Sequence, residues 1–344
     1  MITNPAASDA GLLARPLRIG DIQIPNRVLL APMSGVSDRP FRTIAHKAGA
    51  GLVVSEMVAS ELFVRGDAEA RLRSESVGAG IHVVQLAGRE ARWMAEAAQA
   101  AEEAGAAIID INMGCPARKV TSGACGSALM RDLDHALRLI EATVAATSRP
   151  VTLKMRLGWD AASVNAPELA RRAEAAGVRM VTVHGRTRSQ FYDGAADWDA
   201  VAAVKAAISV PLIVNGDIVD LATAAEAIRR SGADGVMVGR GAYGRPGLPG
   251  TIAREAAGEG AARPTPAEIA EEAAAHYEAI LAHYGVAVGL KAARKHLGWY
   301  LQRMAEAGAA GADAFRGPLQ TANDPAVVLA LLGEAASAGR KLAA

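Results

Sequence analysis

The chain has 344 residues, of which 51% are hydrophobic and 21% are charged. This balance excludes an intrinsically disordered protein and provides enough apolar side chains for a packed core. The 37 basic and 36 acidic residues give a net charge of +1, which excludes an overall basic protein of the histone type. A nucleic-acid surface would therefore have to be a local patch. The length suits an α/β barrel of about 250 residues with a further segment.

Segments that would direct the chain to or through a membrane are not predicted. The apolar runs of the chain are shorter than the ~18 residues that a membrane span requires. The N-terminal stretch lacks the basic start and apolar centre of a secretory peptide, so we expect a cytoplasmic protein. Two cysteines cannot form a disulfide framework, and the 7 histidines show no metal-binding spacing, so no metal site is expected.

Short runs rich in β-branched residues alternate with amphipathic stretches along residues 1–257. Eight such runs are expected to be strands: 27–31, 52–55, 82–86, 107–111, 151–155, 180–183, 212–214 and 235–238. The stretches between them, among them 89–104 and 220–230, have helical periodicity and are followed by glycines. Repeated strand–helix units of this kind predict an α/β fold, a (β/α)8 barrel over residues 1–257.

The remainder of the chain has a different pattern. A linker rich in glycine and proline is expected at 258–266, followed by a helical domain at 267–344. The helices are predicted at 267–284, 288–307 and 324–342. The second of them carries an apolar stripe of Leu290, Ala293, Leu297 and Leu301. The sequence thus predicts a barrel followed by a small helical domain.

Polar residues follow the predicted strands, and in a (β/α)8 barrel these positions line the active site. In chain order they are Pro32-Met33-Ser34, Glu56-Met57, Gln85, Asp110 with Asn112, Lys154 with Arg156, His184 with Arg186, Asn215-Gly216-Asp217 and Gly239-Arg240. The longest insertion, 113–132, follows the fourth strand and contains both cysteines. We expect a functional loop there.

The ends of the last two strands predict a phosphate site. Asn215-Gly216-Asp217 and Gly239-Arg240 provide backbone N–H groups and a guanidinium. The stretch GRGAYG at 239–244 also matches G-x-G-x-x-G. However, it follows the last strand, and Pro246 and Pro249 interrupt the helix that a dinucleotide fold requires. Flavin mononucleotide (FMN), which has a single terminal phosphate, fits this rim better.

Lys154, at the end of the fifth strand, allows three interpretations. It can form a Schiff base, place a positive charge near the N1/O2 edge of a reduced flavin, or pair with Glu56 or Asp110. Gln85 and His184 favour the flavin, because amide and imidazole groups suit hydrogen bonds to the edges of its ring system.

Cys115 lies in the stretch DINMGCP just after the fourth strand, where its thiol should reach the barrel mouth. A thiol with an ordinary pKa of ~8.5 is protonated at neutral pH and still gives up its proton readily, which suits a general acid. Cys125 is spaced for neither a metal site nor a dithiol motif, and we interpret it as a small apolar residue.

Nine sequence motifs, taken together and in their order along the chain, resemble those of the transfer-RNA dihydrouridine synthases, most of all the bacterial B-type members. The resemblance covers about 17–301 and rests on NRVLLAPMSGVSDRPFR, SEMVAS, DINMGCPARKV, GSAL, VTLKMRLGW, TVHGRTR, NGDI, GRGAYGRP and KAARKHLGWYL. The stretch TSGACG departs from the family pattern, because relatives often have a basic or asparagine-containing segment there. One loop contact to RNA is therefore in doubt.

The resemblance implies an FMN-bearing barrel, NADPH as electron donor and reduction of specific uridines in tRNA. It implies that FMN is held by Pro32, Met33, Ser34, Gln85, Lys154, His184, Asn215, Gly216, Asp217, Gly239 and Arg240. Asn112 and Arg156 would contact the uracil. Hydride from flavin N5 would reach C6 while Cys115 donates a proton to C5 from the opposite face.

RNA binding requires a basic surface near the barrel mouth and access to the base. A base stacked in folded RNA cannot reach the barrel floor, so the target uridine has to be extruded. The stretch 279–305 has no acidic residue, and within it Lys291, Arg294 and Lys295 share a helical face. With Arg186 at the mouth, we expect these residues to contact tRNA.

Trp299 and Tyr300, in the same stretch, are expected to be core residues rather than platforms on which bases stack. Two other functions stay open. One is an FMN-dependent small-molecule oxidoreductase of the dihydroorotate dehydrogenase or old-yellow-enzyme type, and the other is a non-catalytic RNA-binding protein. For the protein that the resemblance implies, a monomer is expected.

Overall fold

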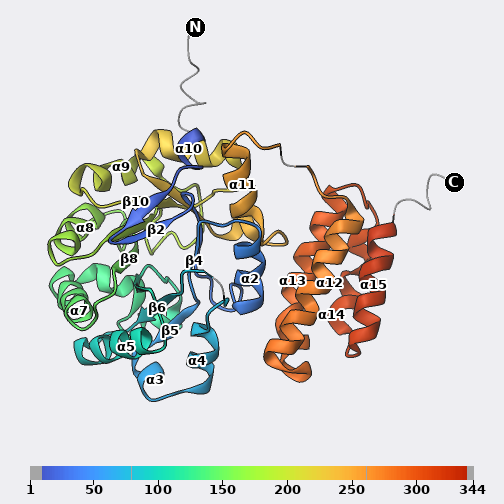
Figure 1. The fold of residues 1–344 in the computed structure, drawn as a ribbon, viewed down its shortest axis with the longest axis horizontal. Helices are drawn as coiled ribbons and strands as arrows, with labels where there is room; N and C mark the ends of the chain where they lie inside the picture. Colours follow the sequence, from blue (N-terminus) through green and yellow to red (C-terminus); the bar gives the residue numbers. More distant parts are fainter. Residues whose placement is uncertain (1–9, 79, 261, 339–344) are drawn as a thin grey trace, which may run out of the picture.

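The computed structural model of the chain describes residues 10–78, 80–260 and 262–338. A closed barrel forms the N-terminal part, and a bundle of helices lies beside it (Figure 1). Strands and helices alternate up to Ala256, and helices follow from Pro266 onward. Across the described ranges, no helix is both long enough and apolar enough to cross a membrane.

A nine-stranded parallel sheet forms the barrel. Its strands are β3 (Val28–Leu30), β4 (Leu52–Val53), β5 (Met57–Ala59), β6 (Val83–Ala87), β7 (Ile108–Met113), β8 (Val151–Arg156), β9 (Met180–His184), β10 (Leu212–Asn215) and β11 (Gly235–Val238). The strand order is β4-β3-β11-β10-β9-β8-β7-β6-β5. Because β4 and β5 follow each other in the chain, the edges of the sheet meet, and the Ser55 N–H donates to the Val83 carbonyl across the seam at 3.1 Å. The predicted (β/α)8 barrel is confirmed.

The strand predicted at 52–55 is present as the shorter β4, and β5, which was not predicted, follows it. β4 pairs with β3, whereas β5 pairs with β6. The interruption includes Glu56, whose buried carboxylate accepts a hydrogen bond from the Gly35 N–H at 2.5 Å. The strand ends before its predicted bound because a buried carboxylate must find a donor, and here the donor lies outside the strand ladder.

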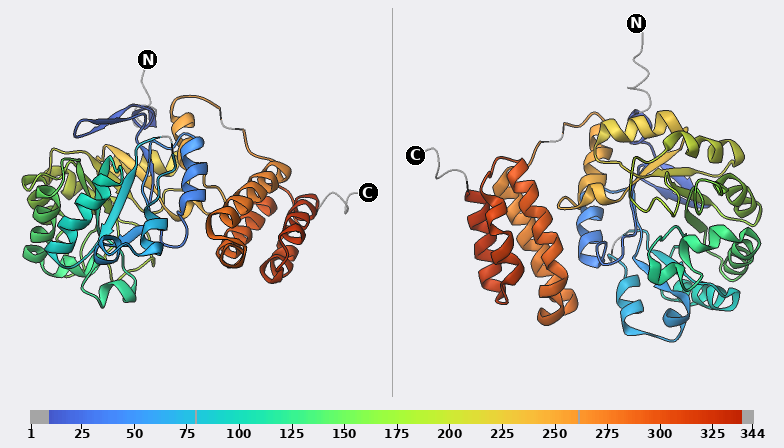
Figure 2. Two further views of the ribbon diagram at one scale, coloured as in Figure 1. Left: turned by 60° about the horizontal axis from the view of Figure 1, so that its bottom comes forward. Right: turned by 180° about the vertical axis from the view of Figure 1, so that it is seen from behind.

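Helices surround the sheet, as two further views show (Figure 2). They are α2 (Arg39–Lys47), α3 (Ser60–Val64), α4 (Ala68–Ser74), α5 (Ala91–Glu103), α6 (Arg118–Thr121), α7 (Leu133–Ala145), α8 (Ala166–Ala175), α9 (Trp198–Ala207), α10 (Leu221–Ser231) and α11 (Leu248–Ala256). Two short 3-10 helices, η1 (Gly126–Arg131) and η2 (Arg240–Ala242), follow β7 and β11. The helices predicted at 89–104 and 220–230 correspond to α5 and α10, and Asp220 caps α10 by accepting from the Thr223 N–H at 2.7 Å.

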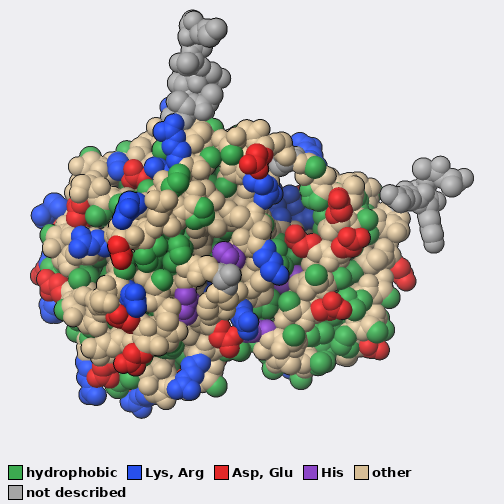
Figure 3. Space-filling view, viewed as in Figure 1, with side chains coloured by type: hydrophobic (Ala, Val, Ile, Leu, Met, Phe, Trp, Pro, Cys, Tyr) green, Lys and Arg blue, Asp and Glu red, His purple; other side chains and the backbone are tan. Residues whose placement is uncertain are grey.

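A hairpin closes the end of the barrel at which the strands begin. Its strands, β1 (Leu17–Ile19) and β2 (Ile22–Ile24), are antiparallel. Ile19 and Ile24 are fully buried in one cluster with Leu29 and Ile108 of the barrel interior. Figure 3 shows this closed face of the molecule from outside. The sequence interpretation missed the hairpin, since three-residue strands have too little alternation to stand out.

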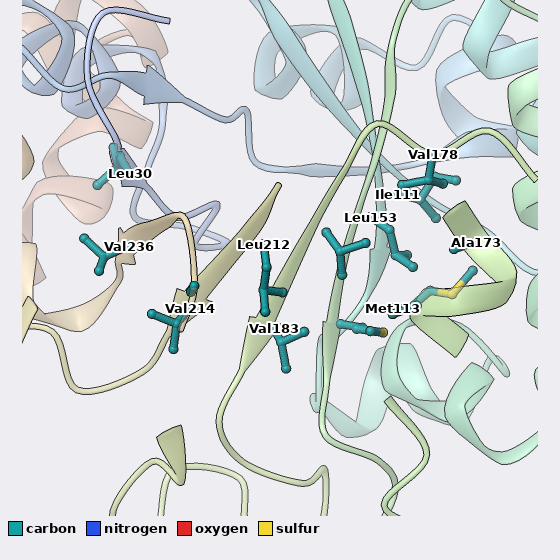
Figure 4. Packing of buried hydrophobic residues seen from close by; sticks show 14 of the residues in the cluster. Leu30, Ile111, Met113, Leu153, Ala173, Val178, Val183, Leu212, Val214 and Val236 are labelled. Atoms are coloured by element: carbon teal, nitrogen blue, oxygen red, sulfur yellow. The ribbon is translucent and has the colours of Figure 1, made fainter. Parts of the chain in front are cut away.

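Side chains alternate between the two sides of the barrel strands. Val183, Val214 and Val236 belong to the large cluster between the sheet and the helices (Figure 4). Ile213 and Met237, one position away, belong to the cluster inside the barrel. The period of two therefore decides which residues can reach the interior.

The same alternation turns polar residues of β7 and β8 inward. Their apolar neighbours in the chain belong to the cluster outside the sheet. Asp110 and Thr152 are Cα partners on adjacent strands, and Asn112 and Lys154 form the next such pair toward the strand ends. Two successive layers of the interior are thus polar, and the second of them reaches the open end of the barrel.

The C-terminal helices form a bundle with its own core. They are α12 (Pro266–Tyr284), α13 (Val286–Glu306), α14 (Arg316–Thr321) and α15 (Pro325–Ser337), with a 3-10 helix η3 (Ala312–Phe315). In the predicted stripe, Ala293, Leu297 and Leu301 are buried and Leu290 packs against them, which confirms it. The helices predicted at 267–284 and 288–307 match α12 and α13. That predicted at 324–342 matches α15 up to Ser337, and 339–342 lie outside the described residues. α14 was not predicted.

The barrel and the bundle are in direct contact. Phe41 of α2 lies 5.8 Å from the ring centroids of both His276 and His296. Gly244 meets α13 so closely that a Cβ atom there would lie 2.6 Å from the carbonyl oxygen of Trp299. Its φ of +65° is also a conformation that side chains disfavour, so only glycine suits this contact.

Candidate functional site

The open end of the barrel forms a pocket of about 800 Å³. Every residue predicted to hold the cofactor lines it: Pro32, Met33, Ser34, Gln85, Lys154, His184, Asn215, Gly216, Asp217, Gly239 and Arg240. Three other predicted site residues line it too, namely Asn112, Cys115 and Arg156. The volume is within the range of ~300–1,000 Å³ that small-molecule and cofactor sites occupy.

Lys154 lies at the floor of this pocket. Its ammonium donates to Asn215 Oδ1 at 3.1 Å, and Asn215 Nδ2 donates to the Met237 carbonyl at 2.7 Å. Burial, with a smaller contribution from nearby Arg156, lowers the pKa of Lys154 to about 8. The partner of Lys154 is an amide, and no carboxylate of the described residues forms an ion pair with it. Its charge is therefore available to a ligand.

His184 ends β9 beside this lysine and is uncharged. Burial and then the charges of Arg156, Lys154 and two further arginines hold the pKa of His184 well below its usual value. Arg186 Nη1 lies 3.2 Å from His184 Nε2. Since a guanidinium can only donate, Nε2 is the acceptor and the proton of the neutral ring is on Nδ1. His184 thus presents an N–H donor without adding charge.

Arg186 is part of the wall behind the pocket rather than of its surface. Its side chain is 2% exposed and donates to the carbonyls of Asp193 and Gly194. It also forms an ion pair with Asp217 at 2.7 Å. The structure therefore gives Arg186 four partners inside the chain, His184 included, and places it away from the solvent side of the mouth.

Arg156 joins two loops at the mouth. Its Nε donates to the Gly114 carbonyl at 2.9 Å, and its Nη1 donates to the carbonyls of Thr187 and Phe191 at 2.8 and 2.7 Å. Burial lowers the pKa of Arg156 to about 10. The guanidinium thus holds the loop after β7, which carries Cys115, against the loop after β9.

Cys115 is fixed by its backbone at the edge of the pocket. Its N–H donates to Asn112 Oδ1 at 3.0 Å, and its carbonyl accepts from the N–H and the hydroxyl of Ser127 at 3.1 and 2.9 Å. Gly126 lies so close that a Cβ atom there would be 2.8 Å from the Cys115 carbonyl oxygen. Burial raises the pKa of the thiol. The sulfur is therefore protonated at neutral pH, as a proton donor requires.

The loops after β10 and β11 provide groups for an anion. Gly216 and Asp217 have positive φ values of +117° and +57°, and Gly239 precedes the 3-10 helix η2. The Arg240 guanidinium lies 3.8 Å from Asp217, and its side chain is 44% exposed at the mouth. Backbone N–H groups, a partly free guanidinium and Lys154 form a donor set that fits an anionic, phosphate-bearing cofactor.

Several aromatic and polar residues of the pocket were not predicted. Tyr192 is 47% exposed and lies under the Arg240 guanidinium, 4.3 Å from its ring centroid. Tyr243 stacks on Trp299 at 3.8 Å, so the bundle contributes to the pocket wall. Tyr300 is buried as expected, whereas Trp299 lines the pocket. The signal for Tyr192, an aromatic residue in a polar loop after a strand, was present in the sequence.

The predicted basic face of α13 is divided between solvent and the barrel. Lys291 is exposed, and Arg294 is partly buried with its Nε lacking a hydrogen-bond partner among the described residues. Lys295 is half-buried, and its charge faces Asp38 and Glu56 of the barrel. These two carboxylates, Lys295 and Tyr284, whose hydroxyl bonds to Asp38, are called the junction below. The three basic residues therefore do not present one common solvent face.

The fold and the site define the class of the protein. Histamine dehydrogenase from Rhizobium sp. 4-9 superposes with a TM-score of 0.58 at 15% identity, over 78% of this chain and 51% of that one. This likeness shows the barrel fold. The mouth adds a cationic pocket with a protonated thiol, so the class that fold and site define is a barrel protein whose open end suits an anionic ligand.

The dihydrouridine synthase (Dus) family model matches residues 29–338. A probable tRNA-dihydrouridine synthase of Rhizobium leguminosarum bv. phaseoli is 58% identical over 92% of this chain and 98% of its own length. The tRNA-dihydrouridine synthase B of Xanthomonas axonopodis pv. citri is 44% identical over 92% of this chain and 94% of its own. The chain belongs to the dihydrouridine synthase family and is a flavin-dependent oxidoreductase, which confirms the resemblance.

Proposed function

We propose that the protein is a tRNA-dihydrouridine synthase, which reduces the C5=C6 bond of specific uridines in tRNA with FMN as cofactor and NADPH as electron donor. The observation that carries the proposal is the thiol of Cys115. It is protonated, its backbone is anchored, and it lies in the same pocket as Lys154. Family membership supports the reaction class, and the names of its relatives support tRNA as the substrate.

The donor set of the pocket supports FMN in particular. Arg240 and the backbone around Gly216 and Gly239 would hold its phosphate, while Lys154 and His184 would face the ring system. The Lys154 charge would favour an anionic reduced ring, and Asn215 keeps this side chain in place. When bound, reduced FMN supplies the hydride that adds to C6 of the uracil.

Cys115 completes the reduction by donating its proton to C5. Hydride addition at C6 creates negative charge that C5 shares with the C4 carbonyl, and a thiol in contact with C5 removes that charge without a free carbanion. Asn112 and Arg156 line the pocket close to Cys115, and we propose that they contact the uracil. Cys115 is anchored through its own N–H and carbonyl, so its position does not depend on contacts of the sulfur.

The charge distribution of the bundle restricts where RNA can approach. Between Pro266 and Ser337 there are eight acidic and five basic residues, and acidic side chains prevail over the bundle on the face in Figure 3. Basic residues gather on α13, where Arg303 also lines the pocket. We propose that tRNA lies along α13 toward the mouth, contacting Lys291 and Arg294, with the target base extruded.

The test uses purified holoenzyme and tRNA transcribed without modifications. The released cofactor should be FMN by chromatography, and NADPH with tRNA should yield dihydrouridine at defined positions, detected by mass spectrometry. Free uridine and orotate, which both have a C5=C6 bond that NADPH could reduce, serve as controls and should turn over far more slowly. A protein that oxidises NADPH with these small molecules and leaves the tRNA unchanged would contradict the proposal.

A further inference from the structure

Four buried side chains form a continuous hydrogen-bonded line from the barrel interior to Cys115. Thr152 Oγ1 donates to Asp110 Oδ1 at 2.5 Å, and Gln85 Nε2 donates to Asp110 Oδ2 at 2.6 Å. Asn112 Nδ2 donates to Gln85 Oε1 at 2.8 Å. Asn112 Oδ1 then accepts from the Cys115 N–H at 3.0 Å and from the Gly114 N–H at 3.1 Å.

The strand register places these residues in contact. Gln85, Asp110 and Thr152 are Cα partners across β6, β7 and β8, and all three face the interior. Asn112 follows Asp110 by two residues, so it faces the same way one layer nearer the mouth. The hydrogen-bonded line therefore moves one layer toward the barrel mouth between Gln85 and Asn112, and it ends at the loop that carries Cys115.

The line has a direction that its two ends impose. A carboxylate can only accept, so Asp110 must receive an N–H from Gln85, which turns the carbonyl oxygen of Gln85 toward Asn112. At the other end, two backbone N–H groups require the carbonyl oxygen of Asn112. Reversing either amide would place two acceptors or two donors against each other inside the barrel, where an unsatisfied polar group costs most.

We propose that Asp110 is a positioning residue that orients Gln85 and Asn112 and so holds Cys115 at the barrel mouth. Asp110 lies behind the pocket wall and does not line the pocket, whereas Gln85 and Asn112 do. It therefore acts on the reaction only through the residues it orients. We call Thr152, Asp110, Gln85 and Asn112 the amide relay. Its role in proton transfer to uracil rests on the proposed function, whereas its role in fixing the Cys115 loop does not.

Asp110 meets the chemical requirements of this role. Its side chain is buried, and the two donors Thr152 and Gln85 use one oxygen each. Burial raises the pKa of Asp110 to about 6, and the hydrogen bonds from Thr152 and Gln85 oppose the increase. Above that pH the group is a carboxylate, which leaves Gln85 a single orientation.

The sharpest test reverses one link and then restores it. Gln85→Glu places two carboxylates against each other. The hydrogen bond to Asp110 is then lost, and Asp110 no longer determines how residue 85 and Asn112 are oriented. Adding Asp110→Asn to Gln85→Glu gives the new glutamate a donor again, and its second oxygen can accept from Asn112 as Gln85 does. The double variant restores every link through a different set of atoms.

The rate of hydrogen exchange at the Gly114 and Cys115 amides, measured on the peptide that carries them, reports on the amide relay and requires no catalytic turnover. In the holoenzyme at pH 7.5, Gln85→Glu should speed this exchange about tenfold, the effect of losing one hydrogen bond, and the double variant should return to within about twofold of wild type. Exchange in the double variant as fast as in Gln85→Glu, or no change in Gln85→Glu itself, would overturn the proposal.

A second pair of variants covers the case in which Gln85→Glu does not fold. Thr152→Val removes one donor to Asp110 and should speed the same exchange about threefold. Thr143→Val is the matched control, because Thr143 is equally buried and its hydroxyl donates to the Leu139 carbonyl within α7. Equal effects of the two variants would show a general loss of packing and would refute the relay.

The oxidation of reduced holoenzyme by tRNA links the relay to the reaction. Displacing a reacting group by about 1 Å can cost ~100-fold, so Thr152→Val, whose side chain does not line the pocket, should slow tRNA-dependent oxidation far more than it slows reduction by NADPH. If the wild-type holoenzyme leaves tRNA unchanged, the proposed function fails. The exchange ratios still decide whether the relay holds Cys115.

Discussion

The barrel mouth and the junction both bury charged side chains, but with opposite signs and different partners. At the mouth, Lys154 bonds to an amide and Arg156 to carbonyls, and within the described ranges neither forms an ion pair, although the charge of the buried Asp110 acts on Lys154. At the junction, Asp38 and Glu56 share Lys295 and the nearby arginines. Burial lowers the pKa of Lys154 and raises the pKa of Asp38, to about 8 and about 6.

The contrast separates a site prepared for a ligand from a contact between two parts of the chain. Cations buried against neutral partners keep a positive potential, which an anionic cofactor or RNA can neutralise. Carboxylates buried against cations of the same chain need no ligand, although their burial has a cost that favours protonation. The sign of the charge that remains unbalanced thus distinguishes the two regions, and five variants test the distinction.

The largest effect is expected for Cys115→Ser, which changes the reaction but not the charge of the mouth. General acids contribute about 100- to 10,000-fold, so formation of dihydrouridine should fall by at least about 100-fold. FMN content and NADPH oxidation should stay near wild type, because the cationic floor is intact. Single-turnover measurements with tRNA provide the check, and undiminished formation would exclude Cys115 as the proton donor.

Arg186→Met should cause the largest loss of stability among changes at the mouth. It leaves Asp217 without its buried partner and two carbonyls without a donor, which should lower the free energy of unfolding by about 3 kcal/mol. Arg171→Met, an exposed arginine paired with Glu168, is the control and should cost below about 0.5 kcal/mol. Equal losses in urea unfolding would contradict the structural role given to Arg186.

Asp38→Asn tests the junction, and the sign of its effect depends on pH. The folded-state pKa of Asp38 is raised to about 6, so the folded protein binds this proton more tightly than the unfolded chain does. Its ionisation therefore destabilises the fold as pH rises through roughly 4 to 6, by up to about 3 kcal/mol above that window. Asparagine still caps α2 and should raise stability at pH 8, by about 2 kcal/mol.

The gain from Asp38→Asn should disappear at pH 4, where the aspartic acid of the wild type is protonated as well. Asp67→Asn is the matched control, since Asp67 caps α4 in the same way from an exposed position. Urea unfolding at both pH values measures the difference. A loss of stability at pH 8 would show that the ion pairing at the junction outweighs the cost of burial.

The smallest effect is expected on the outer surface of α13. Lys291→Glu should weaken tRNA binding several-fold and reduce the salt dependence by about one phosphate contact. Lys295→Met should instead lower stability, because it removes a cation from Asp38 and Glu56. Binding titrations at two salt concentrations separate the two. A larger loss of affinity for Lys295→Met than for Lys291→Glu would restore the predicted common face.

Much of the fold followed from local patterns in the sequence. Strand runs such as 212–214 and the helix after Asp220 were predicted because alternation and capping are local properties. The strand predicted at 52–55 ends at Val53, and both the strand at 57–59 and the hairpin at 17–24 were missed. In both places the outcome depends on partners far away in the sequence: Gly35 for Glu56, and the barrel interior for Ile19.

For the site, the sequence alone determined which residues follow the strands, and most of them, from Pro32 to Arg240, line one pocket. Glu56, Asp110 and Arg186, expected at the same rim, do not line it. Tertiary structure alone decided what each side chain does there. Arg186 and Lys295 are as basic as the exposed Lys291, yet they are engaged with carboxylates inside the protein. Spacing fixes the end of a strand or the face of a helix, whereas burial and the nearest opposite charge depend on which segments pack together.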